Sequence, residues 1–252
     1  MYYKFYICTI KIIKLHTVPS TNDYLKELSG QQTLDDFTVV FAEHQTKGKG
    51  QLGTVWESNK SENLTFSVFV DTSFIDLQRH FYLNCAVSIA VLRVLQKYML
   101  PQLSVKWPND ILSGCKKLSG ILIENSVKSS VKTHSIIGIG VNVNQTKFNS
   151  EYRASSLKSI LGKEINLEEL LILIVAELQT QIAILRQAQY DSLHAVYETH
   201  LFRKNKPSTF ENIEGVRFSG FIKNVTSTGE LQVLVEDDVL KQFKLKEVKL
   251  LY

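Results

Sequence analysis

Charged and amide side chains of the kind that bind a phosphate chain and its metal lie close together near the middle of the sequence. Residues 106–110 read Lys-Trp-Pro-Asn-Asp, and Lys116 and Lys117 follow shortly after them. Proline biases the residue before it toward extended conformations. The runs 103–107 and 118–124 have the composition of strands, so we expect a hairpin that brings the lysine-bearing ends together. Convergent cations with a carboxylate between them suit a nucleotide phosphate chain with Mg²⁺; the alternative is a solvated hairpin with surface lysines.

A second set of chemically suggestive residues is the glycine-rich run 48–56, Gly-Lys-Gly-Gln-Leu-Gly-Thr-Val-Trp. Glycines can adopt backbone angles that expose their N–H groups, so such a loop can wrap an anion, and Lys49 adds positive charge. The run lacks the spacing and the Gly-Lys-Ser/Thr ending of a Walker A loop, and no helix pattern follows it, as a Rossmann fingerprint requires. The alternative is a flexible surface loop.

A third set is residues 138–144, Gly-Ile-Gly-Val-Asn-Val-Asn. Glycines in a strand let a ligand or a neighbouring backbone approach, and alternate residues of a strand point to one face. Because asparagine is depleted in strands, Asn142 and Asn144 in alternation favour a polar site on that face. A strand that simply ends in a turn is the alternative.

The composition bounds these possibilities. A chain of 252 residues with 44% hydrophobic and 21% charged residues is typical of a globular protein that is one large domain or a large and a small one. A net charge of +4 permits an anionic partner but does not mark a nucleic-acid binder. The three cysteines (Cys8, Cys85 and Cys115) lack metal-ligand spacing, which predicts reduced thiols in a cytoplasmic protein without structural zinc. Lysines interrupt the apolar residues 1–13, which favours a first strand over a signal peptide or membrane span.

The elements that must position the chemical groups follow from periodicity. Ser20 and an acid three residues later resemble a capping box, with Gly30 at the helix end. Apolar spacing predicts helices over residues 76–99, 167–186 and 191–200, and strands over 37–43, 64–70, 103–107, 118–124 and 134–143. After Phe202 short strand-sized pieces with glycine turns predict a small SH3-like barrel. We therefore expect an α+β fold with a large domain, 1–203, and a small domain, 204–252.

Taken in order, these segments resemble the biotin–protein ligases, also called biotin–[acetyl-CoA-carboxylase] ligases. The resemblance runs from Ser20 to about Asn144 and rests on Ser-Thr-Asn at 20–22, the loop 48–56, Lys-Trp-Pro-Asn-Asp at 106–110, Lys-Leu-Ser-Gly at 117–120 and the run 138–144. It implies a mixed sheet with helices like the class II aminoacyl-tRNA synthetase core, plus an SH3-like domain. Many relatives carry an N-terminal DNA-binding domain; with Ser20 so near Met1, we expect a ligase without DNA or membrane as a partner.

The resemblance implies a two-step reaction. Biotin and ATP form biotinyl-5′-adenylate and pyrophosphate, and a lysine of a biotin carboxyl carrier protein then takes the biotin. It assigns catalytic roles to Lys117, Lys106 and Asp110, with Mg²⁺ on Asp110. The implied biotin site consists of Ser20, Thr21, Asn22, Gln45, Gly48, Lys49, Gly50, Gln51, Lys117 and Gly120. The implied ATP and adenylate site consists of Lys49, Trp56, Lys106, Asn109, Lys117, Asn142 and Asn144. Trp56 would stack on adenine; its alternative is core packing.

The sequence departs from the family pattern in the glycine loop. The family commonly has Gly-Arg-Gly-Arg, where this chain has Gly-Lys-Gly-Gln at 48–51. Lysine carries charge but lacks the planar fork of arginine, so either another cation helps to retain the adenylate or the intermediate is held less tightly. The enzymatic rival is a lipoate–protein ligase or an octanoyltransferase of the same fold, which could use Cys115 as a nucleophile. The other rival is a non-catalytic module whose barrel binds a protein.

Overall fold

The computed structural model describes residues 10–129, 132–149 and 153–252, and the chain divides into two compact units. The first comprises the residues up to Ser73 together with Leu122–Gly140, and the second comprises Phe74–Ile121 and Val141–Tyr252. Strands β6 (Lys116–Ser129) and β7 (Lys132–Val141) each pass from one unit to the other. Residues 1–9, with Cys8 and most of the expected first strand, lie outside the described part.

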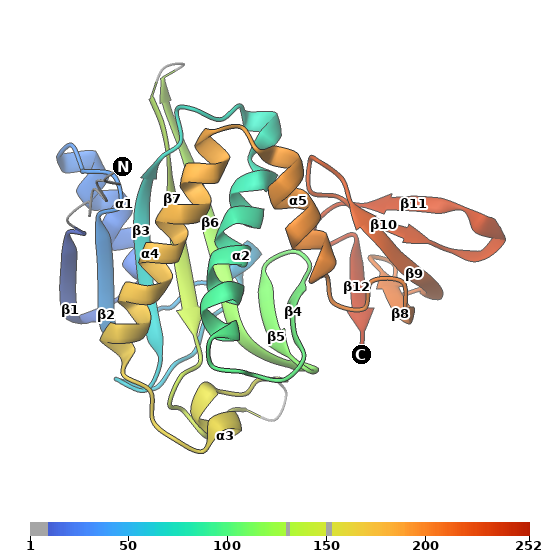
Figure 1. The fold of residues 1–252 in the computed structure, drawn as a ribbon, viewed down its shortest axis with the longest axis horizontal. Coiled ribbons are helices and arrows are strands. Elements are labelled where there is room, and N and C mark those ends of the chain that lie inside the picture. Colours follow the sequence, from blue (N-terminus) through green and yellow to red (C-terminus); the bar gives the residue numbers. More distant parts are fainter. Residues whose placement is uncertain (1–9, 130–131, 150–152) are drawn as a thin grey trace, which may run out of the picture. The chain divides into compact units, whose positions relative to one another are not determined.

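The first unit is a mixed sheet with one helix (Figure 1). Its strands are β1 (Ile12–Val18), β2 (Val39–Gln45) and β3 (Leu64–Asp71), and they are ordered β1-β2-β3-β7-β6 with the crossing strands. β1 runs parallel to β2, and β2 runs antiparallel to β3. Helix α1 (Thr21–Gln31) packs on β2 and β3 over a buried cluster of Leu25, Leu34, Val40 and Ile136. The expected mixed sheet is confirmed.

Helix α1 begins as its sequence predicts and ends later. Ser20 is the N-cap, with extended backbone, and its Oγ accepts a hydrogen bond from the backbone N–H of Asp23 at 3.4 Å. The sequence predicts that Gly30 ends the helix, but this glycine lies inside it, and Gln32 is the C-cap. The backbone N–H of Gln32, the C-cap, donates to the carbonyl of Leu28, so the helical hydrogen bonds continue past Gly30. Glycine can adopt helical backbone angles as well as left-handed ones, and its presence therefore does not by itself end a helix.

The second unit contains the long helices. After a 3₁₀ turn, Leu77–Arg79, helix α2 (Phe81–Gln96) is buried along nearly its whole length. Helices α4 (Leu167–Arg186) and α5 (Tyr190–Thr199) pack against α2, which also contacts β4 (Leu103–Lys106) and β5 (Asp110–Ser113). A short helix, α3 (Leu157–Leu161), precedes α4. Burial on all sides explains why α2 is apolar around its circumference.

The hairpin expected around residues 103–124 is built differently from the prediction. The sequence predicts that strand 103–107 pairs with strand 118–124, but β5 lies between them and the strand order is β6-β5-β4. β4 pairs with β5 with Lys106 opposite Asp110, and β5 pairs with β6 with Asp110 opposite Gly120. The four residues of β5 are Asp-Ile-Leu-Ser, a run too short to show a period. Asp110 therefore lies on a strand and not in a turn.

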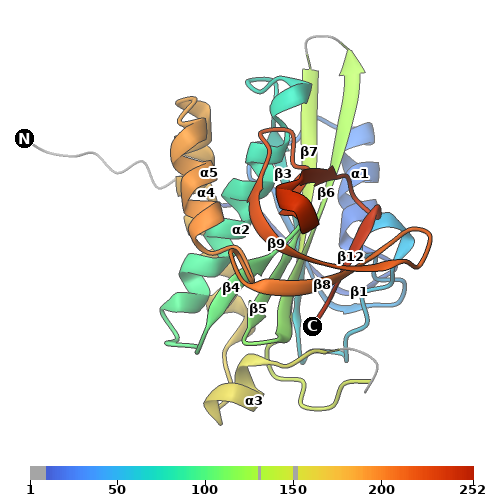
Figure 2. The ribbon, with the colours of Figure 1, turned by 90° about the vertical axis from the view of Figure 1, so that its right-hand side faces the viewer.

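The C-terminal residues form a five-stranded antiparallel sheet, as expected for an SH3-like barrel. Its strands are β8 (Pro207–Asn212), β9 (Arg217–Val225), β10 (Leu231–Leu234), β11 (Leu240–Phe243) and β12 (Val248–Leu251), with a 3₁₀ turn at Glu236–Asp238. Their order is β11-β10-β9-β8-β12. Figure 2 shows β8, β9 and β12 of this sheet. The expected domain boundary after residue 203 stays a prediction.

Candidate functional site

The residues proposed for the site divide between the two units. Those proposed to bind biotin lie mostly in the first unit, with Trp56 and the glycines of β7. Most of those proposed to bind ATP and the metal lie in the second unit: Lys106, Asn109, Asp110, Lys117, Asn142 and Asn144. Gly120, proposed for the biotin site, also lies in the second unit, whereas Lys49, proposed for both sites, lies in the first.

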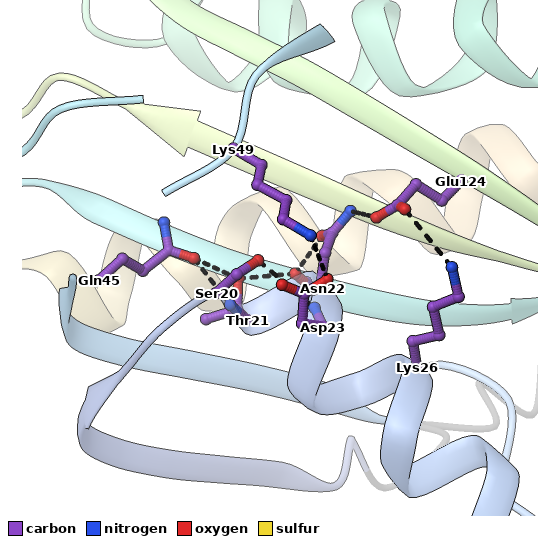
Figure 3. A network of polar contacts seen from close by, with 9 residues as sticks. Ser20, Thr21, Asn22, Asp23, Lys26, Gln45, Lys49 and Glu124 are labelled. Atoms are coloured by element: carbon purple, nitrogen blue, oxygen red, sulfur yellow. Dashed lines mark hydrogen bonds and ion pairs between the residues drawn. The ribbon is translucent and has the colours of Figure 1, made fainter. Parts of the chain in front are cut away.

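In the first unit, the N-cap and the first turn of α1 carry a polar network (Figure 3). Ser20, Thr21 and Asn22 are 2–3% exposed. Gln45 Oε1 accepts from the backbone N–H of Thr21 at 2.7 Å and lies 3.0 Å from its hydroxyl. Thr21 at the start of α1 and Gln45 at the end of β2, both singled out by the sequence, are therefore in contact.

Two members of this network were not predicted. The hydroxyl of Ser67 on β3 lies 2.7 Å from Thr21 Oγ1 and 2.5 Å from Asn22 Oδ1. The carboxylate of Glu124 on β6 accepts from Asn22 Nδ2 at 2.8 Å, and Lys26 Nζ lies 3.8 Å from its other oxygen. The only signal for Ser67 in the sequence is that it is a polar residue within an otherwise mostly apolar strand. Nothing local to Glu124 indicates that it faces a residue about one hundred positions away.

The glycine-rich loop folds back on itself as a narrow hairpin. The N–H of Trp56 donates to the carbonyl of Gly48 at 3.0 Å, and the N–H of Gly50 donates to the carbonyl of Thr54 at 2.7 Å. A 3₁₀ turn at Gln51–Gly53 forms the tip, where Gly53 has a φ of 84°. A side chain at position 48 would strike the carbonyl of Trp56. The glycines are therefore needed for the turn and for the close approach of its two arms.

Lys49 ties this loop to α1. Its Nζ lies 2.6 Å from Asp23 Oδ1, and both side chains are nearly half exposed. The hydrogen bond to Asp23 raises the pKa of Lys49 above its ordinary value. A raised lysine pKa means that the ion pair is present at neutral pH and is lost only as the pH rises through that higher value. Because the pair is exposed, its contribution to stability is small.

The two glycines of β7 each make room for one side chain of the candidate site. A Cβ at position 138 would overlap the carboxamide of Asn22, and a Cβ at position 140 would lie 2.5 Å from the indole of Trp56. Glycine was expected here so that a ligand or a backbone could approach. The structure shows instead that two side chains of the site approach, and that Trp56 packs on the strand.

In the second unit, Lys117 and Asp110 form an ion pair. Lys117 Nζ lies 2.7 Å from Asp110 Oδ1, with both side chains partly exposed. The backbone N–H of Lys117 donates to the carbonyl of Arg153 at 2.7 Å, so the main chain of Arg153 lies beside that of Lys117. The expected closeness of a cation and a carboxylate is observed, although Asp110 comes from a strand that was not predicted.

Lys106 and Arg153 contact the same aromatic ring. Lys106 Nζ lies 5.0 Å from the ring centroid of Tyr252, and the guanidinium of Arg153 lies 5.1 Å from it. Phe202 packs edge-on against the same ring. Burial, and then the charge of Asp110, raises the pKa of Tyr252, so it is a neutral phenol at physiological pH. Arg153 and Tyr252 were not predicted, and their positions outside the motifs give no signal in the sequence.

The three asparagines of this group bond to the main chain. Asn109 Nδ2 donates to the carbonyl of Ile121 at 2.6 Å, and Asn142 Nδ2 donates to that of Lys117 at 3.3 Å. Asn144 Nδ2 donates to the carbonyl of Ile165, and Asn144 Oδ1 accepts from the backbone N–H of the same residue. Asn109 and Asn142 thus hold the strands around Lys117, whereas Asn144 anchors the segment before α4. No group of three or more His, Cys, Asp or Glu that could hold a metal occurs within residues 10–129, 132–149 and 153–252.

The two described cysteines differ. Cys85 is a buried free thiol of α2 whose pKa is raised by burial, and Cys115 is an exposed free thiol at the turn between β5 and β6. Among the helices of the described part, none is long and apolar enough to cross a membrane.

Comparison with known proteins gives consistent matches. Residues 15–142 match the model of the biotin/lipoate A/B protein ligase family. The chain is 33% identical over 159 residues to the bifunctional ligase/repressor BirA of Bacillus spizizenii, covering 62% of this chain and 48% of BirA. It is 33% identical over 141 residues to the biotin–[acetyl-CoA-carboxylase] ligase of Mycobacterium tuberculosis, covering 55% and 51%. It thus spans about half the length of these curated relatives.

A solved structure matches over nearly the whole chain. The biotin protein ligase of Aquifex aeolicus in complex with biotin and ATP superposes with a TM-score of 0.80 at 26% identity, covering 96% of this chain and 98% of that one.

Proposed function

Because the chain belongs to the biotin/lipoate A/B protein ligase family, we propose that it is a biotin–protein ligase. In the first step an oxygen of biotin's carboxylate attacks the α-phosphorus of ATP, and pyrophosphate leaves. In the second step the ε-amine of a lysine on a biotin carboxyl carrier protein attacks the acyl carbon, loses a proton, and AMP leaves. The observation that carries this proposal is the match over 96% of the chain to a ligase with biotin and ATP bound.

The first unit supplies groups suited to biotin. The ureido ring of biotin has one carbonyl acceptor and two N–H donors, which need partners when they leave water. The buried side chains of Ser20, Thr21 and Asn22 and the partly exposed carboxamide of Gln45 are of that type. The hairpin 48–56 would cover the ligand and exclude water from the mixed anhydride, which water would hydrolyse.

The second unit supplies groups suited to the phosphates. Two anions must approach each other in the first step, so fixed cations lower the barrier by offsetting their repulsion. Lys117, held by Asp110 at 2.7 Å, would contact both the carboxylate of biotin and the α-phosphate. Lys106 would contact the phosphates, and Arg153 is a further cation on the same Tyr252 ring.

Mg²⁺ fits this set of residues. The metal is usually held in nucleotide sites by one or two carboxylates together with substrate phosphates, and Asp110 is one carboxylate with a partly exposed side chain. Asp110 would hold the ion, which would offset phosphate charge when bound. The proposed location is the cytosol, where Cys85 and Cys115, both free thiols, would stay reduced.

The decisive experiment is ATP–pyrophosphate exchange with biotin, with lipoate and octanoate as controls. We expect biotin alone to support exchange, and Lys117→Ala to abolish it. Lys116→Ala is the matched control, because Lys116 is the exposed neighbour of Lys117 and its removal should leave exchange near that of the wild type. Exchange with lipoate but not with biotin would replace this proposal by a lipoate–protein ligase.

The acyltransferase alternative has its own test. Cys115→Ser should leave biotin-dependent exchange unchanged, because a ligase of this kind needs no thiol nucleophile. Acyl transfer from a carrier without ATP, lost in Cys115→Ser, would identify an octanoyltransferase instead.

A further inference from the structure

The carboxamide of Asn22 can have only one orientation in the first unit. A carboxylate oxygen accepts hydrogen bonds and cannot donate one. Glu124 lies 2.8 Å from one end of the carboxamide, so that end must be the NH₂ group. The carbonyl end then faces Ser67 at 2.5 Å. Glu124 thereby determines which end of Asn22 enters the buried network.

That orientation fixes the hydrogen atoms of two hydroxyl groups. Ser67 lies within hydrogen-bonding distance of both Asn22 Oδ1 and Thr21 Oγ1 but has one hydrogen. Because Asn22 Oδ1 can only accept, Ser67 must donate to it and must accept from Thr21. The single hydrogen of Thr21 then points to Ser67. Gln45 Oε1, 3.0 Å from that hydroxyl, is left with the backbone N–H of Thr21 as its donor at 2.7 Å.

The opposite direction would present a different surface to a ligand. If the NH₂ of Asn22 faced Ser67, then Ser67 would donate to Thr21 and Thr21 would donate to Gln45. Gln45 Oε1 would then use both of its lone pairs, and Thr21 Oγ1 would use one of its two. In the direction that Glu124 imposes, Thr21 Oγ1 keeps both lone pairs and Gln45 Oε1 keeps one. The network therefore offers acceptors, which are what the N–H groups of a ureido ring need.

Burial leaves the network little freedom to reorganise. Ser67 is completely buried, and Thr21 and Asn22 are each 3% exposed, so bulk water cannot readily supply a missing donor or acceptor. The carboxamide of Asn22 also lies against Gly138, where even a methyl group would overlap it. Since a buried polar group left unpaired is costly, the direction set at Glu124 is passed from residue to residue.

We propose that Glu124 is a positioning residue that sets the hydrogen-bond direction of the Asn22–Ser67–Thr21–Gln45 network and so makes the first unit select a ligand with paired N–H donors. The inference rests on the proposed function, since it names how the same site would recognise biotin.

The test compares biotin binding by calorimetry in three variants, of which two are single substitutions. In Glu124→Gln the new carboxamide can face Asn22 with either end, so the direction is no longer fixed. We expect the dissociation constant for biotin to rise about fivefold, the effect of one lost hydrogen bond, with the KM for ATP unchanged. In Asn22→Asp two carboxylates face each other, and biotin binding should weaken as well.

The third variant combines Asn22→Asp with Glu124→Gln. The carboxylate introduced at position 22 can only accept from Ser67, and the carboxamide introduced at position 124 can donate to that carboxylate. The pair of changes therefore restores the direction of the network. Biotin should bind to the double variant more tightly than to either single variant.

Lys26→Met is the matched control. It removes the more distant partner of Glu124, at 3.8 Å, and leaves the bond to Asn22, so biotin binding should not change. Equal binding by wild type and Glu124→Gln, or a double variant no better than the weaker single one, would overturn the inference while leaving the ligase proposal intact. Absence of biotin binding to the wild type would instead refute the proposed function.

Discussion

At the scale of single residues, substitutions of Gly138 and Gly140 should affect different substrates of the proposed reaction, because Gly138 lies against Asn22 and Gly140 against Trp56. We expect Gly138→Ala to displace Asn22 and raise the KM for biotin on the order of tenfold, with little effect on ATP. Gly140→Ala should displace the indole of Trp56 and raise the KM for ATP, with little effect on the KM for biotin. Steady-state exchange kinetics with each substrate varied in turn would check this. Each variant is the control for the other. If each variant raised the KM for biotin and the KM for ATP to the same extent, the assigned roles would be wrong.

Gln51 lies at the tip of the loop, in the 3₁₀ turn, where the family commonly has arginine. We expect Gln51→Arg to add a bidentate donor for phosphate and to lower the release of adenylate. Labelling of lysines on an unrelated protein mixed with enzyme, biotin and ATP should therefore decrease. Equal labelling by wild type and variant would show that adenylate retention does not depend on this position.

At the scale of elements, the ion pair of Lys49 with Asp23 holds the loop 48–56 against α1. Asp23→Asn should increase tryptic cleavage within the loop about two- to fivefold, the range for an exposed ion pair, as measured by mass spectrometry. Glu27→Gln is the control, because it removes the same charge from an exposed position of α1. Because the pKa of Lys49 is raised, the ratio should be the same at about pH 7 and about pH 9. No increase in cleavage would mean that the loop is held by its own backbone bonds.

Helix α1 also allows a test of stability. Gly30 lies within the helix, is exposed, and has open space where a side chain would be. Gly30→Ala should stabilise the protein by about 0.5–1 kcal/mol, because glycine is a poor helix former. Gly162→Ala is the opposing control: its φ is +73° at a helix C-cap, so alanine should destabilise by about 1 kcal/mol. Denaturant unfolding would measure both, and a loss of stability in Gly30→Ala would contradict its helical placement.

Helices and strands could be predicted from the sequence where the apolar spacing repeats over a long enough segment. Helix α4 has the predicted bounds, 167–186, because its apolar spacing runs over five turns and Asn166 caps it. Strand β5 was missed because four residues show no period. For the site, motif residues such as Lys117 and Asp110 were identified by type and order, and they do form a pair. Glu124, Ser67 and Arg153 were missed because their partners are far away in sequence, and only the fold brings them together.

At the scale of the whole molecule, the C-terminal sheet reaches the proposed phosphate site within the second unit. The indole of Trp107 donates to the carbonyl of Gly229 at 2.9 Å, and Glu198 of α5 accepts from the backbone of Val225 at 2.9 Å. At the chain end, the ring of Tyr252 contacts both Lys106 and Arg153. The sheet therefore contributes to holding the two cations.

Tyr252 gives a direct test of that contribution. Tyr252→Ala removes the ring and should raise the KM for ATP about fivefold, in line with cation–π contacts at partly exposed sites. Tyr252→Phe keeps the ring and should stay close to the wild type, because the neutral phenol contributes through its face. Exchange kinetics at varied ATP would measure both. An equal loss in the two variants would point to the hydroxyl, and no loss in Tyr252→Ala would show that the cations are held without the ring.

The difference between the two cysteines has a practical consequence for labelling. Cys85 is buried and its pKa is raised, whereas Cys115 is exposed two residues before Lys117. A maleimide dye at neutral pH should therefore react with Cys115 and spare Cys85. With Cys8→Ser as the only change, the native chain carries a single attachment point for a fluorophore beside the proposed phosphate site. Its emission could then follow nucleotide binding in real time.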